Sequence, residues 1–297
     1  MKRLPHLIAT LALTAGATGN AFAELSDVCP ANIRLADTGI EGMEELSRAF
    51  GPFADSFSEK TGLDIEFFSV SDRTAAATAL RYDEVDMILA GPSEYAVIKS
   101  RQDVDIVFGI ERDHYGTYFV VPADSDAQQL SDIADKRVAL KDAGSTTGHI
   151  VPTWMMVQAG IDPDRDVNVV MAGDARIRAL ANGDVEVLGG GYRDVSVLER
   201  VAPDFDYRIT GDSGTMPRDP FIARSSLGSE CISGLREVVE RNGEEMFSSF
   251  VASAQEGGTD EAQNRAKYFD GRFVFDITDS EYDLIREAYK MVGMSLD

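Results

Sequence analysis

The sequence predicts an α/β protein with two lobes, each built on a mixed, mostly parallel sheet flanked by helices. Short apolar runs alternate with amphipathic segments of helical period along most of the chain. The late segments resume the early ones around a middle run, which indicates that one lobe is inserted into the other. Two crossing strands, near 118–124 and 206–215, then join the lobes, and a ligand is expected in the cleft between them.

The early part of the chain is rich in short buried strands. The strands are predicted over Ile33–Ala36, Ile65–Val70, Val85–Leu89, Val104–Gly109 and Gly116–Val121. The helices between them are predicted over Glu44–Thr61, Arg73–Tyr82 and Glu94–Ser100. The first of these carries Phe50, Phe53 and Phe57 on one side, which predicts a face that packs on the sheet.

The later part repeats the alternation and then ends in helices. Strands are predicted over Arg137–Lys141, Val167–Met171, Val185–Leu188 and Tyr207–Thr210, and helices over Leu130–Asp135, Thr147–Gln158 and Asp174–Asn182. Residues 216–224 contain two prolines and are predicted as a turn and a strand. Ile232–Ala254 and Asp279–Met294 are predicted as amphipathic closing helices.

Residues 1–23 have the features of a cleavable secretory signal peptide. Lys2 and Arg3 precede the apolar run Leu7–Ala17, and Ala21-Phe22-Ala23 forms a cleavage site. The apolar run is too short to span a bilayer, so we predict that the mature protein lies in the periplasm without membrane insertion. We also expect it to be a monomer. The predicted domains are a discontinuous lobe over 24–120 and 211–297 and an inserted lobe over 121–210.

The chain is strongly acidic, with a formal net charge of −23 that becomes −25 when Lys2 and Arg3 leave with the signal peptide. Nucleic acid is therefore not an expected partner, because phosphate contacts need a basic surface. An anionic ligand would require a site that is locally positive.

Cys29 and Cys231 are the two cysteines, far apart in sequence. In an oxidising compartment such a pair favours a disulfide, which would be worth roughly 2–4 kcal/mol. Two buried free thiols are the alternative.

The segment Gly144-Ser145-Thr146-Thr147-Gly148 is the main candidate for a ligand site. It follows a predicted strand and opens a predicted helix, where unpaired backbone amides and the helix dipole favour an oxyanion. Ser145, Thr146 and Thr147 add hydroxyl donors, and the flanking glycines permit close approach. The alternative is an ordinary Ser/Thr helix cap, although three successive hydroxyls exceed what one cap requires.

In this order and spacing, several segments resemble the periplasmic phosphonate-binding proteins of ABC transporters, within the type 2 periplasmic-binding family that also holds phosphite and phosphate binders. The most specific part is Gly144–Gly148 followed by Val151-Pro152. The others are Phe67-Phe68, Ala79–Tyr82 with Val85-Asp86, Tyr115, Ala179–Val185 and Asp219-Pro220.

The resemblance implies a role for several residues. Ser145, Thr146 and Thr147 would hold the oxygens of the phosphonate, and Tyr115 would line the cleft. Asp219 would contact the amino group of an aminoalkylphosphonate, unless it is only a turn residue before Pro220.

The chain also departs from the family pattern. Arg73 stands where the family has its first cleft tyrosine, a family histidine is missing near Gly173, and Tyr192-Arg193 replaces an acid. Asp194 would supply that acid if the alignment shifts by one residue. Arg73 and Arg193 would then grip an anion without a free amine, or else be solvated surface charges.

These observations predict capture of an organophosphonate or phosphite for an ABC permease. The same fold would also serve a sensor that reports to a membrane histidine kinase or a chemoreceptor. Catalysis is not expected, because the three histidines, His6, His114 and His149, form no catalytic or metal-binding motif. Neither a metal nor a cofactor is implied, and the sequence leaves the identity of the anion open.

Overall fold

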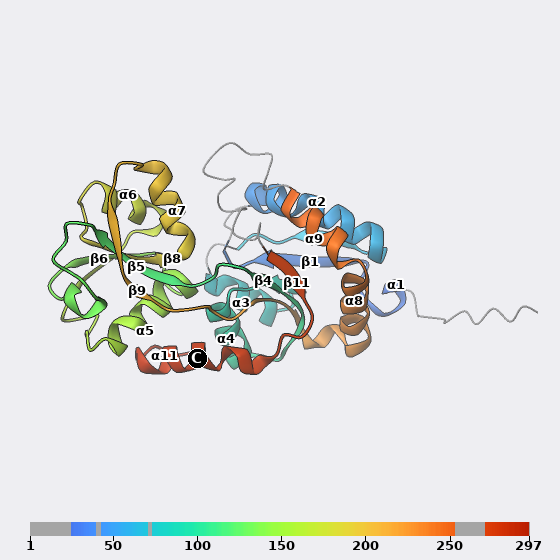
Figure 1. Cartoon of the computed structure of the whole chain (residues 1–297). Helices are drawn as coiled ribbons and strands as arrows, with labels where there is room; N and C mark the ends of the chain where they lie inside the picture. Colours follow the sequence, from blue (N-terminus) through green and yellow to red (C-terminus); the bar gives the residue numbers. More distant parts are fainter. Residues whose placement is uncertain (1–24, 40–42, 71–72, 253–270, 297) are drawn as a thin grey trace, which may run out of the picture.

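The computed structural model describes residues 25–39, 43–70, 73–252 and 271–296. The predicted signal peptide, 1–23, lies outside them. Figure 1 shows two sheets side by side, each covered by helices. We call the six-stranded sheet with its helices lobe 1 and the five-stranded sheet with its helices lobe 2. None of the helices that the model describes is long and apolar enough to cross a membrane.

The sheet of lobe 1 has the strand order β11-β4-β10-β3-β1-β2. β1 pairs in parallel with β2 and β3, whereas β10 pairs antiparallel with β3 and β4, and β11 antiparallel with β4. The strands are β1 (Asn32–Asp37), β2 (Asp64–Phe67), β3 (Met87–Leu89), β4 (Val104–Arg112), β10 (Asp219–Arg224) and β11 (Gly271–Val274).

The sheet of lobe 2 has the order β7-β6-β8-β5-β9. β6 pairs in parallel with β7 and β8, and β5 pairs antiparallel with β8 and β9. The strands are β5 (Thr117–Pro122), β6 (Arg137–Leu140), β7 (Asn168–Met171), β8 (Val187–Gly191) and β9 (Tyr207–Asp212). The mixed α/β fold is thus confirmed, with more antiparallel pairing than predicted.

Helices cover both faces of the sheet of lobe 1, because alternate strand residues point to opposite faces. Phe221 packs in the cluster with α2, α8 and α9, while the next residue, Ile222, packs with α3 and α4. The helices are α1 (Leu25–Val28), α2 (Met43–Thr61), α3 (Arg73–Arg81), α4 (Pro92–Arg101), α8 (Ser229–Arg241) and α9 (Gly243–Ala252), with a short 3-10 helix η4 (Ser225–Leu227).

Lobe 2 is built in the same way. Phe119 of β5 packs with α5, and its neighbour Val120 packs with α6 and α7 on the other face. The helices are α5 (Val151–Gln158), α6 (Arg176–Ala181) and α7 (Tyr192–Val201), with the short turns η1 (Leu130–Ile133), η2 (Thr146–Ile150) and η3 (Gly173–Ala175).

The predicted aromatic face of α2 lies in the core of lobe 1. Phe50, Phe53 and Phe57 are 2%, 2% and 1% exposed. Next to them a disulfide joins Cys29 to Cys231, 202 residues apart, which confirms the predicted pairing. It ties the start of β1 to α8.

Some elements differ from the sequence prediction. The single helix predicted over Ile232–Ala254 is two helices within the described residues, because α8 ends at Arg241 and the Asn242 side chain bonds back to the Val238 carbonyl. The helix predicted over Leu130–Asp135 is only a 3-10 turn, Leu130–Ile133, whereas the helix predicted from Asp174 begins as a 3-10 turn and continues as α6. Helix α7 and strand β11 were not predicted, since a glycine run and a short charged segment gave no clear period.

The chain passes between the two sheets through 113–116 and 213–218. The last helix, α11 (Asp283–Met291), follows the 3-10 helix η6 (Asp279–Tyr282) and lies along both lobes (Figure 1). Ile285 packs in one cluster with Ala96 of α4 and Met155 of α5. Helix α11 therefore packs against both lobes.

Candidate functional site

The segment Gly144–Gly148, which we call the hydroxyl turn, links β6 to α5. Its helical part begins at Thr146, one residue earlier than predicted, as a π-turn in which the Ile150 amide bonds to the Ser145 carbonyl at 2.9 Å. Turns of this kind are frequent at functional sites. Gly144 has φ of 85°, a conformation that favours glycine. A Cβ on Gly148 would lie 2.4 Å from Cβ of Lys141.

The hydroxyls of this turn do not serve as an ordinary helix cap. Ser145 stands at the N-cap position and makes no side-chain cap hydrogen bond, although it is buried. Thr146 directs its hydroxyl to lobe 1, and Thr147 places its own near Gly191 of β8. The alternative that these residues form an ordinary Ser/Thr helix cap is therefore wrong.

The Thr146 hydroxyl meets a second strand-to-helix turn, Gly91-Pro92-Ser93-Glu94, which we call the acid turn. It follows β3 and opens α4. Thr146 Oγ1 accepts a hydrogen bond from the Ser93 amide at 3.0 Å and lies 2.7 Å from Ser93 Oγ. It also donates to Glu94 Oε2 at 3.4 Å. The predicted ligand turn thus faces the other lobe and contacts a buried carboxylate there.

Tyr115 lies beside this contact, in the first link between the lobes. Burial raises the pKa of its phenol well above the ordinary value, while the neighbouring Arg112 charge and a hydrogen bond with Thr146 oppose the rise. The Arg112 guanidinium carbon sits 3.2 Å from the centre of the Tyr115 ring. Tyr115 therefore connects the hydroxyl turn with a stacked cation.

Asp219, at the start of β10, is bound to that same cation. The Arg112 Nη2 atom lies 2.8 Å from Asp219 Oδ1 and 2.7 Å from Oδ2, and the carboxylate is 1% exposed. Sequence reasoning missed Arg112. The sequence offered one signal for it, its position three residues before Tyr115, and the structure places it at the end of β4.

A cavity of about 370 Å³ lies where the two links run between the lobes. It is lined by Glu111, Arg112, Asp113, Tyr115, Thr215, Met216 and Arg218. Of the predicted site residues it reaches Tyr115, whereas Ser145, Thr146 and Thr147 are not among its lining residues, and Thr146 instead contacts Ser93 of lobe 1. Its lining holds two arginines and two acids, so the positive site expected from the sequence is not found there.

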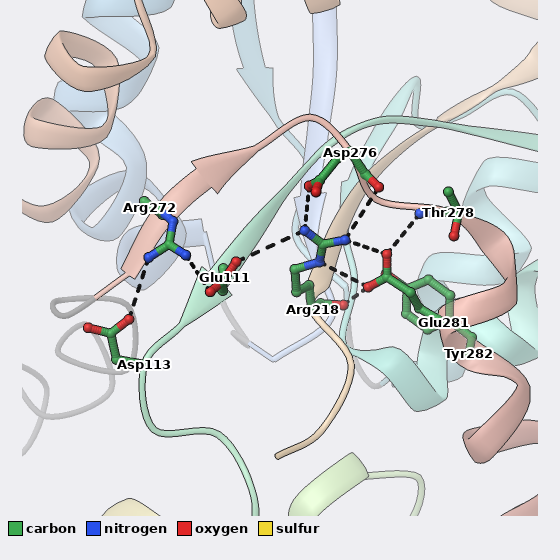
Figure 2. A network of polar contacts seen from close by, with 8 residues as sticks. All are labelled: Glu111, Asp113, Arg218, Arg272, Asp276, Thr278, Glu281 and Tyr282. Atoms are coloured by element: carbon green, nitrogen blue, oxygen red, sulfur yellow. Dashed lines mark hydrogen bonds and ion pairs between the residues drawn. The ribbon is translucent and has the colours of Figure 1, made fainter.

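Figure 2 shows the acidic side chains that surround the Arg218 guanidinium. Its guanidinium bonds to Asp276 at 2.5 Å and to Glu281, and it lies 4.0 Å from Glu111. The bond to Glu281 is the main reason that the pKa of Arg218 is raised. This network ties the second link to the C-terminal segment, so Arg218 is a structural cation at the cavity wall.

Lobe 2 contains another buried pair of the same type. Arg176 is 4% exposed and binds Asp194 through Nη2 at 2.6 Å. Asp194, the acid that a shifted alignment would bring to the ligand, is therefore engaged by Arg176, another residue that the sequence did not single out. A Cβ on Gly190 would lie 2.0 Å from Asp194 Oδ2, which explains the glycine there.

The remaining predicted residues lie apart from the cavity. Tyr192 stacks on Tyr118, with ring centres 4.1 Å apart, and its hydroxyl bonds to Asp212. Arg193 is half-buried in the first turn of α7. The backbone of Arg73 opens α3, and its side chain lies outside the described residues.

His149 supports the hydroxyl turn from within. Its Nδ1 accepts the Gly144 amide at 3.0 Å, and burial lowers its pKa, so the ring is held neutral. Within the described ranges no cluster of His, Cys, Asp and Glu side chains is arranged to hold a metal ion.

The chain is similar to known substrate-binding proteins in both sequence and fold. A family model described as "ABC transporter, phosphonate, periplasmic substrate-binding protein" matches residues 40–249. The phosphate-import protein PhnD of Mycolicibacterium smegmatis is 26% identical over 288 residues, which cover 89% of this chain and 87% of that protein.

Two solved structures show the same fold. PhnD1 from Prochlorococcus marinus, in complex with methylphosphonate, superimposes with a TM-score of 0.69 at 15% identity, covering 90% of this chain and 100% of that one. The aliphatic sulphonate binding protein SsuA from Escherichia coli gives 0.61 at 13% identity, covering 88% and 86%.

Proposed function

Because the chain belongs to the family of periplasmic phosphonate substrate-binding proteins of ABC transporters, we propose that it captures an organophosphonate or phosphite between its lobes. A permease would take up the anion from the closed form, and export would use the signal peptide over residues 1–23. The role is binding and release, with no bond broken.

The Thr146 hydroxyl carries this proposal. It is 4% exposed, and instead of capping its own helix it points across the lobe contact to Ser93 and Glu94. A small tetrahedral anion that entered here would meet this hydroxyl, the Ser145 hydroxyl and the first amides of η2, which have no acceptor inside the helix. Tyr115 would close one side of the site.

The pairing of Asp219 with Arg112 favours a ligand without an amine. An amino group that sought the Asp219 carboxylate would compete with a guanidinium already 2.7 Å away. Because a buried carboxylate and arginine hold each other strongly once both are desolvated, this exchange is costly. We therefore expect methylphosphonate or phosphite to bind more tightly than aminoethylphosphonate.

Titration calorimetry on the mature chain tests the site. Thr146→Val keeps the branched shape and removes the hydroxyl, and we expect it to weaken methylphosphonate binding by about 10- to 100-fold. Ser145→Ala should have a similar effect. Thr78→Val, on an exposed position of α3, is the matched control and should bind like the wild type. Unchanged affinity in both turn variants would contradict the assignment.

A further inference from the structure

The C-terminal segment 279–296, which we call the strap, is fixed to lobe 1 at both of its ends. At its start, the Asp279 carboxylate accepts a hydrogen bond from the Tyr95 hydroxyl of α4 at 2.7 Å. At its end, the Leu296 carbonyl accepts a hydrogen bond from Ser100 Oγ, near the end of the same helix, at 2.8 Å. The strap therefore runs along α4 (Figure 1), and its polar contacts attach it to lobe 1.

The middle of the strap packs on lobe 2. Helix α11 contacts both α5 and η2, the turn that begins at Thr146. Ile285 and Ala288 are 0% and 1% exposed, and they lie in one hydrophobic cluster with Met155 and Met156 of α5. We call this the shared cluster. Because η2 runs directly into α5, the strap supports the same helical segment that presents the hydroxyl turn.

The shared cluster and the core of lobe 1 differ in the side chains that fill them. The core under α2 is built largely of phenylalanine rings. The shared cluster instead contains Met155, Met156 and Met216, with Met294 packed at its margin. Methionine side chains are unbranched and adapt to a changed contact. Such a contact allows one helix to slide a short way along another, which is the shear type of domain motion.

A change in the angle between the lobes would move α5 against α11, because the strap is attached to lobe 1 while α5 belongs to lobe 2. In this structure the lobes touch, since the Ser93 amide donates to Thr146 Oγ1 and the Ser93 hydroxyl donates to the Gly144 carbonyl. We propose that the strap is a fixed support across which lobe 2 turns. The packing of α11 on α5 then sets the fraction of molecules in which the lobes are in contact.

This fraction matters for binding. A ligand held between the lobes binds with an apparent affinity that is reduced in proportion to the fraction of molecules able to hold it. Ala288 lies in the shared cluster and lines neither the cavity nor the hydroxyl turn. A larger side chain there would still separate α5 from α11 and lower that fraction. The effect on affinity rests on the proposed function, whereas the effect on the lobe arrangement does not.

The test compares Ala288→Val with Ala49→Val. Ala49 is a buried alanine of α2 that packs in the core of lobe 1 alone, so it controls for overpacking as such. Small-angle X-ray scattering of the ligand-free mature chain should give a larger radius of gyration for Ala288→Val than for wild type and Ala49→Val. In calorimetry, Ala288→Val should bind methylphosphonate about 10-fold more weakly, and Ala49→Val within about twofold of wild type.

A second measurement needs no substitution. Trp154, the single tryptophan of the sequence, lies on α5 and packs against the shared cluster. Its indole Nε1 is buried without a hydrogen-bond partner among the described residues, so its emission should respond to a changed contact. We expect methylphosphonate to change the fluorescence of the wild type. Unchanged emission at saturation would mean that α5 and α11 move as one body, and would overturn the proposal.

The scattering result separates the strap from the proposed function. Equal radii of gyration for Ala288→Val and wild type would overturn the strap whether or not a phosphonate binds. A wild-type protein that binds neither methylphosphonate nor phosphite would overturn the proposed function, and the scattering comparison would still decide the role of the strap.

Discussion

The hydroxyl turn of lobe 2 and the acid turn of lobe 1 occupy equivalent places, since each leads from the end of a strand into a helix. Their chemistry is opposite. The first presents the hydroxyls of Ser145 and Thr146, of which Thr146 donates to Glu94, and the second presents the Glu94 carboxylate, which accepts that bond. Ser93 joins the two through the Gly144 carbonyl and the Thr146 hydroxyl.

The difference shows that a helix N-terminus alone does not define what a site binds. Both turns lie at a helix N-terminus and present a favourable dipole end, although the Ser93 amide of the acid turn already donates to Thr146 Oγ1. In the acid turn this end is already matched by a carboxylate of its own chain, whereas the hydroxyl turn carries no acid. An external anion is therefore expected to lie on the hydroxyl turn.

The two turns should respond very differently to an added methyl group, and this is the largest effect we expect. Gly148→Ala would place Cβ 2.4 Å from the Lys141 Cβ, which cannot move aside without the backbone, and should lower the free energy of unfolding by about 3 kcal/mol. Gly91→Ala meets the end of the Glu94 side chain at 2.5 Å, which can shift by side-chain rotation alone but is buried and hydrogen-bonded, so we expect a smaller loss of about 1–2 kcal/mol. Urea unfolding of both variants measures the contrast, and equal losses would contradict it.

Removing the hydroxyl that joins the turns should have an intermediate effect. Ser93→Ala deletes the hydrogen bond to the Gly144 carbonyl and should cost about 1 kcal/mol of stability. Because Thr146 keeps its own hydroxyl, methylphosphonate binding should weaken by less than about tenfold. Calorimetry beside Thr146→Val makes the comparison. A larger loss from Ser93→Ala than from Thr146→Val would place the main ligand contact on lobe 1.

The smallest effect concerns acid sensitivity of the hydroxyl turn. Burial lowers the folded-state pKa of His149 below its ordinary 6.5, so the unfolded chain takes up this proton first as pH falls. The stability that depends on neutral His149 is therefore present above about pH 6.5 and is lost as pH falls below it. His149→Gln removes the titration. Thermal melts at about pH 8 and about pH 5.5 should show a larger drop in Tm for the wild type than for the variant. Parallel drops would exclude His149 as the cause.

Several parts of this picture were accessible from sequence because they depend on neighbours along the chain. The position of the hydroxyl turn follows from an apolar strand, small polar residues and a helix in direct succession. The buried face of α2 follows from the spacing of its phenylalanines, and the disulfide from having two cysteines in a chain predicted to be exported. The prediction of one helix in place of α8 and α9 was wrong, because the Asn242 side chain bonds back to the Val238 carbonyl and ends α8, although the hydrophobic period continues past it.

Sequence alone therefore determined which segment carries the donors, and the tertiary structure decided what those donors face. Thr146 meets Glu94 across 52 positions, Arg112 reaches Asp219 across 107, and Arg176 takes Asp194 across 18. No local pattern encodes such pairs, because they form only when the fold brings distant segments together, within one lobe for Arg112–Asp219 and Arg176–Asp194 and between the lobes for Thr146–Glu94. Burial makes each pairing important for stability, because a charged group removed from water is strongly destabilising unless it finds a partner within the fold.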